Sequence, residues 1–138
     1  MNKTREIIEM ARGVRHSWGS DPLKVAEKLG INVRENSGPK PAAYLFKIAE
    51  YPAMIALNGC RDELTKKVLC AHELGHAMLD HGNIRKYDGY QKPQDCREEY
   101  EANLFAVAYF IDDDELNRPL EEMPNFMLRM ILEENIGK

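Results

Sequence analysis

A pentapeptide, His-Glu-Leu-Gly-His at residues 72–76, limits the folds open to this chain more than any other feature of its sequence. An α-helix turns about 100° per residue, so His72 and His76 would lie on the same helical face, one turn apart. Two imidazoles placed in this way can bind one metal ion. Glu73 is rotated off their line, so it can reach a water on that metal without binding the metal itself. The motif therefore predicts a helix that supplies two metal ligands and a general base.

The sequence around the motif predicts that this helix is long and amphipathic, ending near Gly82. Apolar or small residues recur at helical spacing along one face: Leu64, Val68, Ala71, Gly75 and Met78. Because this stripe is complete without the histidines, they need not be explained as core residues. A glycine inside a helix costs about 1 kcal/mol relative to alanine, and a neighbouring element packed closely against the site would account for Gly75.

A catalytic zinc site commonly has two histidines, one glutamate and a water, so a third protein ligand must come from another part of the chain. His81 is not expected to serve, since it would lie near the C-terminal end of the same helix and interact with its dipole. The next predicted helix offers Glu98, Glu99 and Glu101. Glu101 is favoured because it lies at the border of the buried face, four residues before Phe105. Glu98 would lie on much the same side, and Glu99 is expected to point elsewhere; all three remain alternatives.

Length and composition predict one folded domain over residues 1–138, since the chain is 43% hydrophobic and 30% charged. The formal net charge of -4 argues against general nucleic-acid binding, which needs a concentrated positive surface. The charged N-terminal residues do not resemble a signal peptide, and no segment approaches the roughly 20 apolar residues of a membrane span. Cys60, Cys70 and Cys96 form no CxxC pair, which is typical of free thiols in a reducing compartment. We therefore expect a cytoplasmic protein.

The rest of the sequence predicts helices and a small sheet. Helices are expected at residues 7–18, 22–29, 62–82, 95–111 and 126–137, strands at 31–34, 43–48 and 53–57, and a loop at 84–93. A polar turn between the second and third strands predicts a hairpin. We expect an α+β, zincin-like fold in which a three-stranded, mostly antiparallel sheet packs against a helical core that carries the His-Glu-x-x-His helix.

Two segments resemble the ImmA/IrrE family of metallopeptidases. Ala-His-Glu-Leu-Gly-His at residues 71–76 is similar to the metal-binding helix of that family, and Glu-Tyr-Glu-Ala-Asn-Leu-Phe-Ala at residues 99–106 is similar to its second motif. Residues 21–33 also resemble its N-terminal helix and strand, so the resemblance covers most of the chain. The chain departs from the family at residues 109–112, where a leucine-rich segment ending in proline is frequent. Because of this difference, the family pattern does not predict where this helix ends or what shape the substrate groove has.

The resemblance implies a zinc-dependent endopeptidase in which His72, His76 and Glu101 bind Zn²⁺ and Glu73 is the catalytic base. Members of the family commonly cleave or inactivate a repressor within a mobile genetic element. A protein substrate, a repressor or another regulator, is therefore expected, with no direct contact to nucleic acid or membrane. The alternative is a zinc-containing interaction module that binds a regulator without turnover. The sequence does not indicate an oligomeric state.

Overall fold

The computed structural model describes residues 3–36, 43–46, 52–59, 62–79, 84–87, 96–116 and 118–134, and the fold is given for these segments. Each of the five predicted helices is present, and none in these segments is long and apolar enough to cross a membrane. The helices are α1 Lys3–Trp18, α2 Pro22–Lys28, α3 Glu63–Met78, α4 Cys96–Phe110 and α5 Asn125–Glu134, with short 3₁₀ turns at Asp113–Glu115 and Leu120–Glu122. The predicted helix ends near Gly82 and Gly137, the predicted helix start at Asp95, and His81 lie outside the described residues.

Capping residues account for the starts of α2 and α3. Asp21 accepts a hydrogen bond from the Leu23 N–H at 3.1 Å, and Pro22 occupies the first turn of α2. At the start of α3, Asp62 Oδ1 accepts from the Thr65 N–H at 2.7 Å. Each cap satisfies a backbone donor that has no partner within its own helix. The local sequence thus sets where the helix that carries His72 and His76 begins.

The described strands form one mixed sheet in the spatial order β1-β3-β2-β4. These strands are β1 Asn32–Asn36, β2 Ala43–Phe46, β3 Met54–Asn58 and β4 Ile84–Tyr87. β1 runs parallel to β3, with Val33 opposite Ile55. β2 is antiparallel to β3, with Leu45 opposite Ile55, and β4 is antiparallel to β2. The expected hairpin between β2 and β3 is therefore present.

The predicted three-stranded, mostly antiparallel sheet is wrong, although helices combined with a small sheet are compatible with the broad α+β class. The described residues contain a fourth strand, β4, inside the segment 84–93 that was expected to be a loop. β4 is only four residues long and shows no alternation of apolar and polar residues that would reveal a strand. The first strand also pairs in parallel, with β3, so that the sheet is mixed. Pairing between distant segments is not encoded in the pattern of either strand alone.

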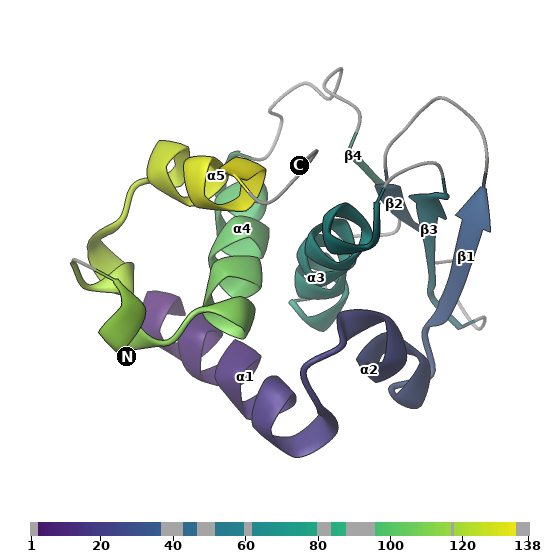
Figure 1. The fold of residues 1–138 in the computed structure, drawn as a ribbon, viewed down its shortest axis with the longest axis horizontal. Coiled ribbons are helices and arrows are strands. Elements are labelled where there is room, and N and C mark those ends of the chain that lie inside the picture. Colours follow the sequence, from purple (N-terminus) through teal and green to yellow (C-terminus); the bar gives the residue numbers. More distant parts are fainter. Residues whose placement is uncertain are drawn as a thin grey trace.

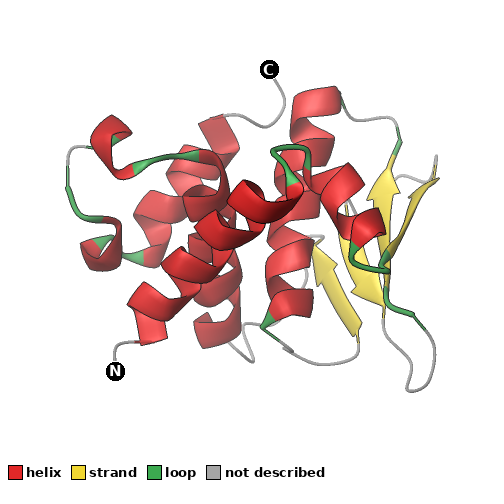
Figure 2. Cartoon of the chain, turned by 90° about the horizontal axis from the view of Figure 1, so that it is seen from below, coloured by secondary structure: helices red, strands yellow, loops and turns green. Residues whose placement is uncertain are grey.

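α3 is the central helix of the fold. Figure 1 shows α3 between the sheet and α4, with α2 below it, and Figure 2 shows the strands gathered on one side of the helices. α1 and α5 pack against α4. The core includes Leu45 and Ile55 of the sheet, Leu74 of α3, and Phe105 of α4, which are all buried.

α4 is covered on every side along most of its length, since residues 101–109 are all buried. It packs against α1, α3 and α5. A helix covered in this way has no continuous polar face from which its orientation can be read. Because of this burial, the sequence gives little basis for deciding which of its glutamates faces α3.

Candidate metal centre

The two histidines of α3 lie side by side in the protein interior. Their Nε2 atoms are 3.2 Å apart, and the rings meet edge to face with centroids 4.8 Å apart. His72 is 3% exposed and His76 is 1% exposed. The helical spacing of four residues therefore brings two buried nitrogen donors to one place.

Glu99 of α4 completes this cluster. Its Oε1 lies 3.3 Å from His72 Nε2, and its Oε2 lies 2.9 Å from His76 Nε2. The Glu99 side chain is 34% exposed, in contrast to the two histidines. Solvent therefore reaches the cluster on the side of the carboxylate.

The distances within the cluster suit a zinc ion. Zinc ligands in a tetrahedral site lie about 2.0–2.1 Å from the metal, which places any two donor atoms about 3.3 Å apart. The two Nε2 atoms are 3.2 Å apart, and each lies near a different oxygen of Glu99, His72 at 3.3 Å from Oε1 and His76 at 2.9 Å from Oε2. Two imidazoles and one carboxylate are also the donor set of many catalytic zinc sites.

Glu101, which the sequence favoured as the third ligand, lies in a different cluster. Its buried Oε2 is 3.5 Å from Lys3 Nζ of α1 and 3.2 Å from Arg97 Nε. Two residues correspond to about 200° around a helix, so Glu99 and Glu101 face nearly opposite sides of α4. Glu98 is half-buried and is not part of the group formed by the two histidines.

Sequence reasoning ranked Glu99 below Glu101 because it used the apolar residues of α4 to choose a buried face. Apolar residues cannot single out one buried face of α4, because its residues 101–109 are all buried. A second signal was present in the polar residues, since Glu99 and Asn103 are four apart and share a face. Polar side chains that share a face of a buried helix need polar partners, which the histidines of α3 provide.

Glu73 is also inside the protein, with only 1% of its surface exposed. Its position follows from α3, on which it is the neighbour of His72, rotated by about 100°. Its charge contributes to the electrostatics of His72. A buried carboxylate adjacent to a metal cluster has the location needed for a general base.

The charges of the cluster stabilise one another. Burial lowers the pKa of His72, but its hydrogen bonds with Glu99 and Asn103 and the charges of Glu73 and Glu99 outweigh burial and raise the pKa above its ordinary value. Burial raises the pKa of Glu99, whereas the hydrogen bonds and charges of both histidines lower it well below its usual range. Glu99 is therefore an ionised carboxylate, as a metal ligand must be.

A second acidic group lies on the surface at Asp112, Asp114 and Glu115. All three side chains are exposed, and Glu115 Oε1 accepts a hydrogen bond from the Asp112 N–H at 2.9 Å. Arg15 of α1 lies 3.6 Å from the Asp112 carboxylate. Local hydrogen bonding and an ion pair account for this group, so we assign no metal to it.

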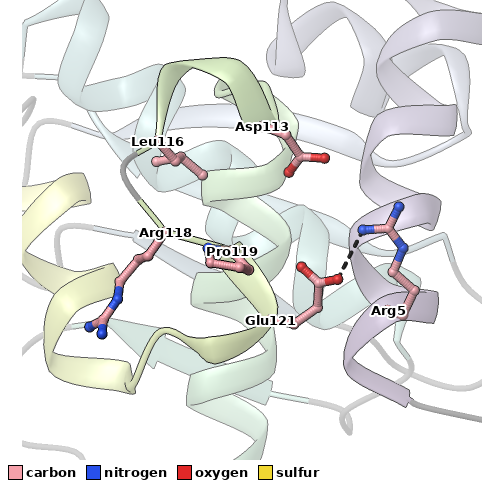
Figure 3. Close-up of a pocket in the computed structure, with 6 residues that line it drawn as sticks. All are labelled: Arg5, Asp113, Leu116, Arg118, Pro119 and Glu121. Atoms are coloured by element: carbon pink, nitrogen blue, oxygen red, sulfur yellow. Dashed lines mark hydrogen bonds and ion pairs between the residues drawn. The ribbon is translucent and has the colours of Figure 1, made fainter.

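Two pockets lie away from the histidines, along α1 and the segment that follows α4. The pocket in Figure 3 has a volume of about 390 Å³ and is lined by Arg5, Asp113, Leu116, Arg118, Pro119 and Glu121. In it, Arg5 forms an ion pair with Glu121 at 3.1 Å, and the charge of Glu121 raises the pKa of Arg5. The other is lined by Arg12, Arg15, His16, Ser20 and Asp112. Neither pocket includes a residue of the metal cluster.

The residues of the site lie in the part of the chain that matches a known protein family. Residues 26–134 match the model for the IrrE N-terminal-like domain, a peptidase family. The matched region contains all of α3, α4 and α5, and therefore all three donor residues of the cluster. A search of curated proteins gave no match.

Proposed function

The chain belongs to the peptidase family defined by the IrrE N-terminal-like domain, and on this basis we propose that it is a zinc-dependent endopeptidase. The family match covers most of the chain and confirms the resemblance to the ImmA/IrrE family that the two motifs predicted. Family membership supports a peptidase, and hence a hydrolase, of the metallopeptidase type. The observation that carries the finer proposal is the convergence of His72, His76 and Glu99.

We assign the metal to these three residues rather than to a set that contains Glu101. The assignment is supported by the donor distances and by the depressed pKa of Glu99, which keeps this carboxylate ionised. A zinc ion held by three protein ligands supplies a Lewis acid that polarises a carbonyl and makes a water molecule more acidic. The partial exposure of Glu99 leaves this side of the cluster open to solvent and substrate.

Glu73 would act as the general base and then as the general acid. Its carboxylate accepts a proton from the water that attacks the scissile carbonyl carbon. It then transfers that proton to the amide nitrogen as the C–N bond breaks, so that the amine leaves neutral. His72 and His76 would hold the metal, and because these two side chains and Glu73 are buried, solvent would reach the site only from the side of Glu99.

The proposed substrate is a protein, a repressor or another regulator of a mobile genetic element, as the family resemblance implies. An extended peptide could add to a sheet edge, which is a recurring mode of peptide recognition. In the described part of the sheet, β1 and β4 are the outer strands, and β2, which pairs with β4, lies against α3. We further propose a cytoplasmic location without direct contact to nucleic acid, in keeping with the acidic net charge and the free thiols expected from the sequence.

Metal analysis and cleavage together test the proposal. Purified wild-type protein should contain about one zinc per chain by mass spectrometry, and His76→Ala should lose it. Candidate repressors co-expressed with the wild type should be cleaved, and Glu73→Gln should abolish cleavage while retaining the metal. Zinc without Glu73-dependent cleavage would support an interaction module in place of an enzyme, and absence of metal from the wild type would reject the metal centre.

A further inference from the structure

The C-terminal end of α4 is tied to α1 by contacts with the helix backbone. Arg12 Nη2 donates to the carbonyl oxygen of Ile111 at 3.1 Å. Arg15 Nη1 donates to the carbonyl oxygen of Tyr109 at 3.4 Å. In the opposite direction, the Tyr109 hydroxyl donates at 2.7 Å to the carbonyl oxygen of Gly19, the residue that follows α1. Hydrogen bonds in both directions therefore join α1 to the end of α4.

Opposite charges and apolar packing reinforce these hydrogen bonds. Arg12 Nη2 also lies 3.0 Å from the carboxylate of Asp113, and the Arg12 side chain is only 22% exposed. Cations near the C-terminus of a helix interact favourably with the helix dipole as well. α1 packs against α4, and its buried residues are Ile7, Ile8, Ala11 and Val14. Together these contacts fix how α1 and α4 lie on each other.

Two further observations concern the same contacts. α1 precedes residues 26–134, which match the family model. On α4, Tyr109 and Ile111 fall within residues 109–112, where the sequence departs from the family pattern. The contacts with α1 give this segment a role that the family pattern does not predict.

A contact with a helix backbone restricts the rotation of the whole helix about its axis. Because hydrogen bonds join successive turns, α4 turns as a unit, and a rotation at Tyr109 is transmitted to Glu99. Side-chain ends lie about 5–6 Å from a helix axis, so a rotation of about 10° would move the Glu99 carboxylate by about 1 Å. Distances in a metal site are kept within about 0.2 Å. A small rotation of α4 is therefore enough to disturb the donor set.

We propose that Arg12, Arg15 and Tyr109 are positioning residues for the metal centre. Their contacts set the rotation of α4 and so hold Glu99 beside the two histidines of α3. This inference rests on the proposed function and extends its site to α1. The competing explanation is that these contacts only stabilise the fold, while the Glu99 side chain adjusts to any rotation. Their loss would then lower stability and leave zinc affinity unchanged.

The zinc dissociation constant separates these explanations. It is measured on the full chain by competition with a chromophoric chelator, at a temperature at which circular dichroism shows each variant to be folded. Arg12→Met removes the donors and keeps an apolar stem, and Tyr109→Phe removes only the hydroxyl. Changes at residues that act on a site without touching it typically alter affinity by about 2- to 30-fold, and we expect a loss of about 5-fold for each variant.

Arg5→Met is the matched control. Arg5 is also an arginine of α1, and it pairs with Glu9 and Glu121, neither of which belongs to α4. The control thus removes a charge and ion pairs from the same helix without changing the contacts with the end of α4, so its zinc affinity should equal that of the wild type. An equal loss of affinity in Arg5→Met, or no loss in Arg12→Met and Tyr109→Phe, would overturn the proposal.

Crystal structures of the metal-free wild type, Arg12→Met and Arg5→Met provide a measurement that does not depend on metal binding. With α3 superposed, α4 should be rotated in Arg12→Met alone, by about 5° or more, which would move the Glu99 carboxylate by about 0.5 Å. If the wild type binds no zinc but α4 is rotated in Arg12→Met, the proposed function fails and the positioning of Glu99 stands. If the wild type binds zinc and Arg12→Met binds it equally well, with or without a rotation, the positioning role fails and the proposed function stands.

Discussion

Gly75 of α3 lies directly against Phe105 of α4, so closely that a Cβ atom at position 75 would come within 3.0 Å of Phe105 Cβ and 3.2 Å of Phe105 Cγ. The backbone of Ala102 is nearly as close, at 3.3 Å from the same position. α3 and α4 therefore make close contact between the motif that supplies two histidines and the helix that supplies Glu99. The absence of a side chain at Gly75 allows the donors of the two helices to meet.

Gly75→Ala should destabilise the protein and weaken metal binding. Alanine would gain about 1 kcal/mol from helix propensity, but overpacking of a closely packed interior costs about 1–3 kcal/mol, and the contact with Ala102 involves backbone that cannot rotate away. We expect a net loss of about 1 kcal/mol in the free energy of unfolding, measured by urea denaturation. Gly13→Ala in α1 is the control, since a Cβ there has no neighbour within 4 Å and should be neutral or stabilising.

Glu99→Gln should reduce zinc affinity by more than the roughly 10- to 100-fold that is typical of changes outside the ligand set, because a neutral amide oxygen replaces an ionised ligand. Glu101→Gln should keep zinc near the wild-type affinity. Its expected effect is a loss of stability on the order of 1 kcal/mol, since its partners Lys3 and Arg97 are mostly exposed and remain solvated. The reverse result, with zinc lost only in Glu101→Gln, would contradict the assignment of Glu99.

Zinc should raise the thermal stability of the protein, because it would join donors from α3 and α4 that are brought together only by folding. A ligand at 100 times its dissociation constant contributes about 2.7 kcal/mol to the native state. The melting temperature should therefore rise with added zinc and fall with a chelator in the wild type. His76→Ala should show neither shift, and an equal shift in that variant would place the stabilising metal elsewhere.

Asp62 should make the stability of α3 depend on pH in acid. The backbone N–H of Thr65 donates to its carboxylate and lowers the pKa of Asp62 below its ordinary value. A pKa lowered by folding means that the stabilisation is complete above the pKa of the unfolded chain, about 3.9, and is lost as the pH falls through the lower folded value. Asp62→Asn keeps a good cap that does not titrate. The difference in unfolding free energy between wild type and Asp62→Asn, measured by urea between pH 7 and pH 3, should therefore shift in favour of the variant as the pH falls.

The sequence was sufficient where a local rule determines the structure. The spacing of His72 and His76 predicted two neighbouring residues of the cluster, because it depends only on one turn of helix. The caps found at Asp21 and Asp62 are local in the same way, since each bonds a backbone N–H within the first turn of its helix. The need for a close neighbour at Gly75 could also be inferred from the cost of glycine in a helix, and α4 is that neighbour.

Features that depend on packing between distant segments could not be predicted in this way. The sequence favoured Glu101, whereas Glu99 is the residue found beside the histidines, because α4 is buried on all sides and its apolar residues do not define which face meets α3. β4 was missed because four residues carry too little pattern, and the parallel pairing of β1 with β3 is a property of two strands together.

Cys70, two residues before His72, bears on how the centre would respond to oxidants. Its thiol is buried, and burial, followed by the charge of Glu73, raises its pKa far above the ordinary range. A thiol that does not ionise is a poor target for peroxide, since the thiolate is the reactive form. The donors of the cluster are nitrogen and oxygen atoms, and these do not form disulfides or sulfenic acids. Peroxide would therefore leave both the ligands and this neighbouring thiol chemically unchanged, so the centre would keep its metal under oxidative conditions that strip zinc from sites built on cysteine.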